Sequence, residues 1–105
     1  MKLTYPTTLV LHALANGLRH GFEILDATDL PSGTVYPILR RLERDALVSA
    51  NWEDALIAHA EQRPPRRYYE LTAPGRAVLD AASARYRVPR SIATRVRRLR
   101  PARSS

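Results

Sequence analysis

The chain has 105 residues, of which 45% are hydrophobic and 26% are charged, and its formal net charge is +7. This length suits one small domain with an appendage. The sequence contains no run of 18 apolar residues, the length needed to span a membrane. Cysteine is absent, which excludes a disulfide framework and a thiolate metal site. The first residues lack the long apolar region of a signal peptide. We therefore expect a cytoplasmic protein that does not bind membranes.

The charge is unevenly distributed. Residues 1–60 carry 5 basic and 7 acidic side chains, a net of −2, whereas residues 61–105 carry 12 basic and 3 acidic side chains, a net of +9. Every cationic side chain after Lys2 is arginine, whose planar fork of donors matches phosphates and guanine edges. A basic end on an otherwise near-neutral chain indicates a polyanionic partner.

Two helices are predicted before residue 30. The first begins at Thr4-Tyr5-Pro6, because proline is favoured in a first helical turn, and ends at Asn16-Gly17, because both residues tolerate a left-handed cap. Its predicted buried stripe comprises Leu9, Val10, Ala13 and Leu14. A short second helix starts at His20 and is expected to bury Phe22 and Leu25. A turn over residues 29–33 follows it.

The third predicted helix, which runs to about residue 45, is the most informative element. Its apolar side chains recur at i, i+3, i+4 and i+7, as expected of a face against a core; they are Val35, Ile38, Leu39 and Leu42. The opposite face carries Thr34, Tyr36, Arg40, Arg41 and Arg44. Since a proline beyond the first turn clashes and removes a hydrogen bond, Pro37 places the N-cap near Gly33 or Thr34. Such an anchored helix suits a DNA recognition helix.

A β-hairpin is predicted next. Residues 47–52 alternate, with Val48, Ala50 and Trp52 on one face; a loop spans about residues 54–66; and residues 67–71 form the return strand, with Tyr69 and Leu71 facing inward. Thr72 then caps a helix from residue 73 to about 86, which buries Val78, Leu79 and Ala82. The order of elements predicts a mainly α fold with a small β-hairpin wing (α+β), a winged helix-turn-helix plus a C-terminal helix.

The remaining residues are rich in arginine. Ile92, Val96 and Leu99 recur at i, i+4 and i+7, but a helix of this length is marginal in water unless it docks. The segment is either a disordered arm that binds phosphates or a helix that completes a dimer. We expect a winged helix DNA-binding domain over residues 1–72, a C-terminal helical dimerisation region over 73–100 and a disordered tail over 101–105.

Several runs resemble the PadR-type transcriptional regulators: residues 20–24, 33–37, 39–43, 64–72 and 75–76. Together they place the resemblance over about residues 3–86. The resemblance implies a dimeric DNA-binding repressor that pairs through its C-terminal helices and often its first helix. It also implies that the DNA-facing positions fall on Thr34, Tyr36, Pro37 and Arg40 in the third helix, and on Arg66 and Arg67 in the wing.

The predicted function is that of a sequence-specific transcriptional regulator, a repressor that binds a palindromic operator in double-stranded DNA as a homodimer. The candidate DNA-binding residues are Ser32, Thr34, Tyr36, Pro37, Arg40, Arg41, Arg63, Arg66 and Arg67. The candidate dimer contacts are Leu9, Val78, Leu79, Ala82, Tyr86, Ile92 and Val96.

Two other classes of protein fit the composition. One is a basic RNA- or ribosome-associated protein, and the other is a winged-helix module that binds proteins without operator specificity. An enzyme is not expected, because no nucleophile–base arrangement and no Gly-rich phosphate loop is readable. The three histidines have no metal-binding spacing, so no metal or cofactor is expected. Whether a small-molecule inducer acts on the protein is left open by the sequence.

Overall fold

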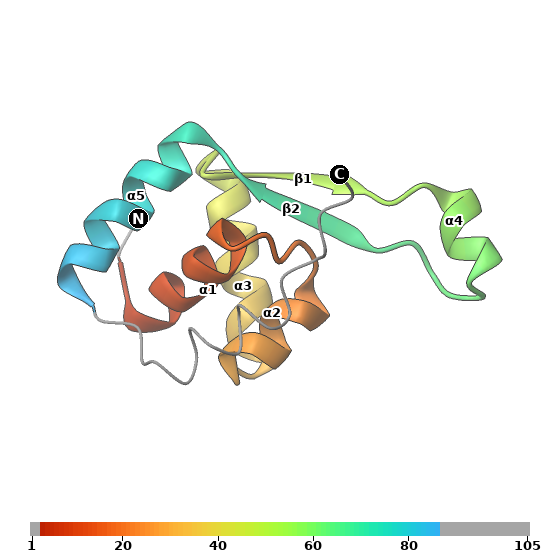
Figure 1. Ribbon diagram of the computed structural model, residues 1–105, viewed down its shortest axis with the longest axis horizontal. Coiled ribbons are helices and arrows are strands. Elements are labelled where there is room, and N and C mark those ends of the chain that lie inside the picture. Colours follow the sequence, from red (N-terminus) through yellow and green to blue (C-terminus); the bar gives the residue numbers. More distant parts are fainter. Residues whose placement is uncertain (1–2, 87–105) are drawn as a thin grey trace.

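The computed structural model describes residues 3–86 and shows the predicted winged helix-turn-helix (Figure 1). In chain order the elements are α1 (Tyr5–Ala15), α2 (Gly21–Thr28), α3 (Ser32–Arg44), β1 (Val48–Trp52), α4 (Ala55–Ala60), β2 (Arg67–Leu71) and α5 (Ala73–Arg85). The hairpin of β1, α4 and β2 is called the wing below. No helix within these residues is both long and apolar enough to cross a membrane.

The predicted helix ends of α1 and α5 are confirmed. The Thr4 hydroxyl accepts a hydrogen bond from the Thr7 N–H at 3.3 Å, which satisfies a first-turn donor of α1. Asn16 is the C-cap, and the following Gly17 has a φ of 92° that glycine adopts without strain. At α5, the Thr72 hydroxyl accepts from the Gly75 N–H at 3.1 Å.

The core lies among α1, α2, α3 and the inner end of the wing, with α5 packed beside α1 (Figure 1). All four apolar residues predicted for the inner face of α3 are buried, as are the four predicted for α1. Leu79 and Ala82 of α5 are also buried, and Val78 is partly buried. The 3.6-residue period of these helices therefore predicted their packing faces correctly.

The inner end of the wing packs in the core, and its outer end projects into solvent. β1 and β2 are antiparallel, with Val48 opposite Leu71 and Trp52 opposite Arg67. Val48 is 2% exposed, whereas Trp52 is 65% exposed, because the hairpin extends beyond the helices that cover its base (Figure 1). The far side of β2 is bonded to the segment before α2: the Tyr69 N–H donates to the Arg19 carbonyl at 2.7 Å. The base of the wing is thus held on both edges of β2.

The prediction that Phe22 is buried was wrong, because this ring is 70% exposed. Helix α2 begins at Gly21, so Phe22 lies in its first turn and points away from the core. The inward face is instead formed by Ile24, Ala27 and Thr28, at the helical spacing i, i+3 and i+4. Leu25 is only partly buried at the edge of this cluster.

The predicted start of the third helix was also wrong. Helix α3 begins at Ser32, and Pro37 lies inside it. The first turn closes because the N–H groups of Thr34 and Val35 both donate to the Pro31 carbonyl. The bond that Pro37 cannot make would go to the carbonyl of Gly33. Gly33 is an exposed residue, so water can hydrogen-bond to its carbonyl and the proline costs less here than in a buried helix.

The predicted loop over residues 54–66 contains a short helix, α4. The Asp54 carboxylate caps it by accepting from the Leu56 N–H at 2.8 Å. Ala58 is fully buried within the wing, whereas Leu56 and Ile57 remain exposed. The run Ala55-Leu56-Ile57-Ala58 forms a helix because it combines an aspartate N-cap with residues that lack glycine and proline.

Candidate nucleic-acid interface

The outward face of α3 presents the side chains that the sequence predicted. Ser32, Arg40 and Arg41 are exposed, and Thr34, Tyr36 and Pro37 are partly exposed. Tyr36 and Arg40 are four residues apart and lie on one face of the helix. Within residues 3–86, Arg40 and Arg41 are in none of the observed ion pairs. Their guanidinium groups are therefore available to an external anion.

Tyr36 also packs against the domain. Its ring lies against Gly21 at the start of α2, where an added Cβ would come within 2.6 Å of the ring atom Cε1. The ring adds to the edge of the core, so its direction is set by packing before any ligand binds. Tyr36 is consequently both an outer core residue and a candidate DNA contact.

The third helix and the wing meet across a cleft of about 420 Å³. Its lining includes Gly21 and Phe22 of α2, Tyr36 of α3, and the segment from Arg63 to Arg67 on the return side of the wing. The cleft brings Tyr36 close to the wing arginines although 30 residues separate Tyr36 from Arg66 in the chain. Two of the sequence-predicted groups therefore form one surface.

The wing arginines differ in their partners. Arg67 donates to the Glu43 carboxylate of α3 at 2.7 Å, and its guanidinium lies 5.1 Å from the centre of the Trp52 ring. These contacts hold the Arg67 side chain between Glu43 of α3 and Trp52 of β1. Arg66 is partly exposed, and its side chain takes part in no observed ion pair of residues 3–86; its backbone is bonded to Glu53, through its N–H to the carboxylate and through its carbonyl to the Glu53 N–H.

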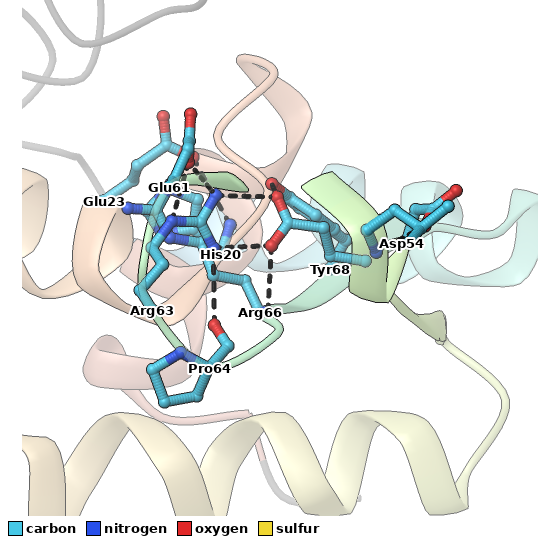
Figure 2. A network of polar contacts seen from close by, with 10 residues as sticks. His20, Glu23, Asp54, Glu61, Arg63, Pro64, Arg66 and Tyr68 are labelled. Atoms are coloured by element: carbon cyan, nitrogen blue, oxygen red, sulfur yellow. Dashed lines mark hydrogen bonds and ion pairs between the residues drawn. The ribbon is translucent and has the colours of Figure 1, made fainter. Parts of the chain in front are cut away.

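Arg63 has a structural role that the sequence did not predict. It donates to Glu53, to Glu61 and to the Pro64 carbonyl, and Figure 2 shows it beside Glu61 and Pro64. Its Nη2 donates to one oxygen of Glu53 at 2.8 Å, and its Nε donates to Glu61 at 2.8 Å. The side chains of Arg63 and Glu53 are 20% and 7% exposed. Two carboxylates therefore neutralise Arg63, which makes it a poorer phosphate ligand than Arg66.

The same contacts explain the acidity of Glu53. The Arg63 guanidinium, the Arg66 backbone N–H and the Tyr68 hydroxyl all donate to this carboxylate, and they hold its pKa at about 2. The largest contribution is the hydrogen bond from Arg63. The ionised Glu53, which follows β1, thus links the residues on both sides of the Pro64-Pro65 segment and Tyr68 of β2.

His20 links this wing network to α2. It precedes α2 as the N-cap residue, its Nε2 lies 3.4 Å from Glu23, and its ring meets the Tyr68 ring edge to face at 5.9 Å. Burial lowers its pKa, so the neutral imidazole is favoured. The sequence signal for this role is a glutamate three residues after a cap position, as in a capping box.

The candidate dimer residues fall into three groups. Leu9, Leu79 and Ala82 are buried within the chain's own core. Val78 and Tyr86 are partly exposed, and Val78 lines an apolar groove of about 460 Å³ together with Leu3, Leu47, Ala77 and Ala81. Ile92 and Val96 lie outside the described residues. Of the predicted dimer residues within 3–86, only Val78 and Tyr86 therefore offer surface to a partner.

No group of three or more histidine or carboxylate side chains in residues 3–86 is arranged to hold a metal ion. The interface is built instead from hydroxyl, aromatic and guanidinium groups. These groups recognise phosphates and base edges by hydrogen bonding and charge.

Most of the chain matches one family of known proteins. Residues 10–81 match the family model described as "Transcriptional regulator PadR-like family". A crystal structure of a PadR-like transcription factor from Bacteroides fragilis is similar, with 28% identity, a TM-score of 0.64, and 75% of this chain and 77% of that chain covered.

Two further solved structures share the fold. One is smu.1704 from Streptococcus mutans UA159, with 21% identity and a TM-score of 0.56 over 81% of this chain and 80% of that chain. The other is a Streptococcus transcriptional regulator, with 20% identity and a TM-score of 0.56 over 81% and 86%. No curated protein is significantly similar to the chain.

Proposed function

Because the chain belongs to the PadR-like family of transcriptional regulators, we propose that it binds a palindromic operator in duplex DNA as a homodimer and acts as a repressor. Helix α3 reads bases in the major groove, and Arg66 on the return side of the wing contacts the adjacent backbone. The function is one of binding, with no catalytic step assigned to any residue.

The observation that carries this proposal is the set of guanidinium groups on α3 and the wing that have no carboxylate partner among the described residues. Within residues 3–86, Arg40 and Arg41 of α3 and Arg66 of the wing have no carboxylate partner among the observed ion pairs. By contrast, Arg63 and Arg67 are paired within the chain. An arginine that has no internal partner can donate both arms of its fork to guanine or phosphate.

The small footprint of one winged helix on DNA supports the proposed dimer. A single winged helix contacts only a few base pairs, so operator specificity is gained when two copies bind two half-sites about one helical turn apart. The groove beside Val78 and the neighbouring Tyr86 supply exposed apolar surface for such a contact. The oligomeric state is measured directly by sedimentation at micromolar concentration.

The test compares Arg40→Ala with Arg76→Ala. Both variants remove one exposed arginine, but Arg76 lies on α5, away from the proposed recognition face. An operator is first selected from random duplexes, and affinities are then measured for it and for a scrambled duplex of the same length. A bidentate arginine–guanine contact is worth about 1–3 kcal/mol of discrimination. Arg40→Ala should therefore lose operator affinity about 5- to 150-fold more than scrambled-DNA affinity.

The alternatives predict different results. An RNA-associated protein would bind structured RNA at least as well as duplex DNA, and the selection would yield no preferred duplex. A protein-interaction module would bind neither, and Arg40→Ala would behave as Arg76→Ala does. Equal losses on the operator and the scrambled duplex would make Arg40 a phosphate contact and would overturn its role in base readout.

A further inference from the structure

The outer end of the wing differs in chemistry from its base. We call residues 53–63 the wing tip; they contain three carboxylates (Glu53, Asp54 and Glu61) and one guanidinium (Arg63), a formal net charge of −2. On α4, within this tip, Leu56 is 78% exposed and Ile57 is 53% exposed. Glu53 is largely buried and paired with Arg63, so the exposed carboxylates of the tip are Asp54 and Glu61, beside two apolar side chains directed to solvent.

This combination does not suit a DNA contact. Carboxylates repel phosphates, and the single arginine of the tip is bonded to Glu53 and Glu61. Adjacent exposed aliphatic side chains are instead a feature of protein interaction surfaces. Arg66, which lies opposite Glu53 at the outer end of the strand ladder, and the exposed face of α4 thus have different partners.

The complementary surface is encoded in the same chain. Residues 87–105 contain seven arginines and no acidic residue, a formal charge of +7. Within them Ile92, Val96 and Leu99 recur at i, i+4 and i+7, which would place three apolar side chains on one helical face. We propose that the wing tip of one protomer binds residues 87–105 of a second copy, with these apolar residues on Leu56 and Ile57 and the arginines beside the carboxylates.

Chain geometry favours the second copy over the same chain. β2 runs toward Thr72 from the wing, and α5 continues from Thr72 to the opposite side of the molecule (Figure 1). Five strand residues span about 17 Å and thirteen helical residues about 20 Å. The six residues from Tyr86 to Ile92 extend at most about 20 Å. Ile92 cannot therefore reach the wing tip of its own chain.

This inference rests on the proposed homodimer and adds a specific contact to it. The contact would connect the two protomers through their DNA-binding wings, in addition to any contact at the groove beside Val78. The α4 face of each wing tip would then be held by the partner, while Arg66, beside Glu53 on the return side of the wing, stays available to DNA.

The absence of cysteine makes disulfide crosslinking a clean test. One chain carries Ile57→Cys, a second carries Ala93→Cys, and the two are mixed and oxidised. We expect a disulfide-linked heterodimer in several-fold higher yield than from the control mixture of Ser49→Cys with Ala93→Cys. Ser49 is exposed on the same hairpin but lies at its base, near the start of β1.

A second variant tests the apolar contact. Adding Leu56→Ser to the Ile57→Cys chain should lower the crosslinking yield several-fold, whereas adding Phe22→Ser should leave it unchanged. Both replaced side chains are largely exposed, so neither change should unfold the protein. Raising the salt concentration should lower the yield as well, because it screens the attraction between carboxylates and arginines.

Sedimentation of the unmodified chain separates the outcomes. A dimer that gives equal yields from the Ile57 and Ser49 mixtures would overturn the wing-tip contact and leave the proposed homodimer intact. A monomer that gives no crosslink would overturn both. A chain that carries both Ile57→Cys and Ala93→Cys and forms only an intrachain disulfide would overturn binding by the second copy.

Discussion

The ring of Tyr36 occupies the space that a side chain at residue 21 would need. A Cβ added to Gly21 would lie 2.6 Å from Cε1 and 2.7 Å from Cζ of that ring. Gly21 starts α2 and Tyr36 lies on the candidate recognition face of α3, so this contact couples the two helices of the helix-turn-helix. The direction of Tyr36 therefore depends on a residue that need not touch DNA itself.

Gly21→Ala should impair DNA binding more than folding. The atoms it would meet belong to the far end of the Tyr36 side chain, which can rotate away without moving the backbone. We expect a loss in unfolding free energy of about 1 kcal/mol, the lower end of the range for overpacked sites, and a clear loss of operator affinity. Urea unfolding and fluorescence anisotropy on the same samples measure the two effects. If the double variant Gly21→Ala, Tyr36→Ala binds DNA no worse than Tyr36→Ala alone, the effect acts through the ring; a further loss would contradict this.

Gly75→Ala should destabilise the domain, because the added Cβ would overlap the Leu47 carbonyl. That carbonyl also accepts the Thr72 N–H at 3.1 Å, so α5 must shift at its first turn. We expect a cost of about 1–3 kcal/mol, as for other overpacked sites. Gly33→Ala is the control, since nothing lies within 4 Å of its added Cβ and alanine is favoured in helices by about 0.5–1 kcal/mol. Equal unfolding midpoints for the two variants would contradict this account.

Arg66→Ala and Arg63→Ala should differ in their dependence on salt. Each phosphate contact contributes about 0.9 to the slope of log K against log salt concentration for duplex DNA. Arg66→Ala should lower the magnitude of that slope by about this amount. Arg63→Ala should leave the slope near that of the parent and lower thermal stability, because it removes the partner of the largely buried Glu53. The reverse assignment of the two effects would refute the separation of roles within the wing.

Acid should weaken the fold through Glu53. Its pKa is held at about 2 in the folded protein, below its ordinary value of 4.5, so its contribution is fully present above pH 4.5. As the pH falls from 4.5 toward 2, Glu53 becomes protonated in the unfolded chain but stays ionised in the folded protein, so the free energy of unfolding decreases. Glu53→Gln should therefore be less stable at pH 7 and lose less stability across this range.

Chemical denaturation at a series of pH values measures this effect. Glu70→Gln, which removes a carboxylate from an exposed position of β2, is the matched control. If the stability profile of Glu53→Gln ran parallel to those of the parent and the Glu70 variant between pH 4.5 and 2, the stabilising role of the Arg63–Glu53 pair would be wrong.

The elements that followed from the sequence are those whose signals are local. Helix α3 has four apolar residues at regular helical spacing, and all four are buried. Thr72 is a strong N-cap residue and does cap α5. The strand positions of Tyr69 and Leu71 also followed from alternation. Local spacing and capping chemistry therefore predicted the order of the elements from α1 to α5, apart from α4.

The elements that sequence did not predict depend on tertiary context. Whether Phe22 is covered depends on the direction in which α2 packs, which its own short sequence does not fix. The cost of Pro37 depends on whether the Gly33 carbonyl is accessible to water. The partner of Arg63 depends on the fold of the wing, because Glu53 is ten residues away. An arginine count cannot separate a guanidinium that is bonded within the chain from one that is free.

β2 is attached on both edges, to β1 and to the carbonyl of Arg19, and this restrains the position of the wing relative to the helices. These backbone hydrogen bonds restrain β2 against the segment before α2, so the proposed complex would present Arg40 and Arg66 to DNA from backbones with little freedom to move apart. On DNA with about 10–10.5 base pairs per turn, inserting one pair between the two contact points rotates one of them by roughly a tenth of a turn. Such an operator would engage the helix or the wing, but not both.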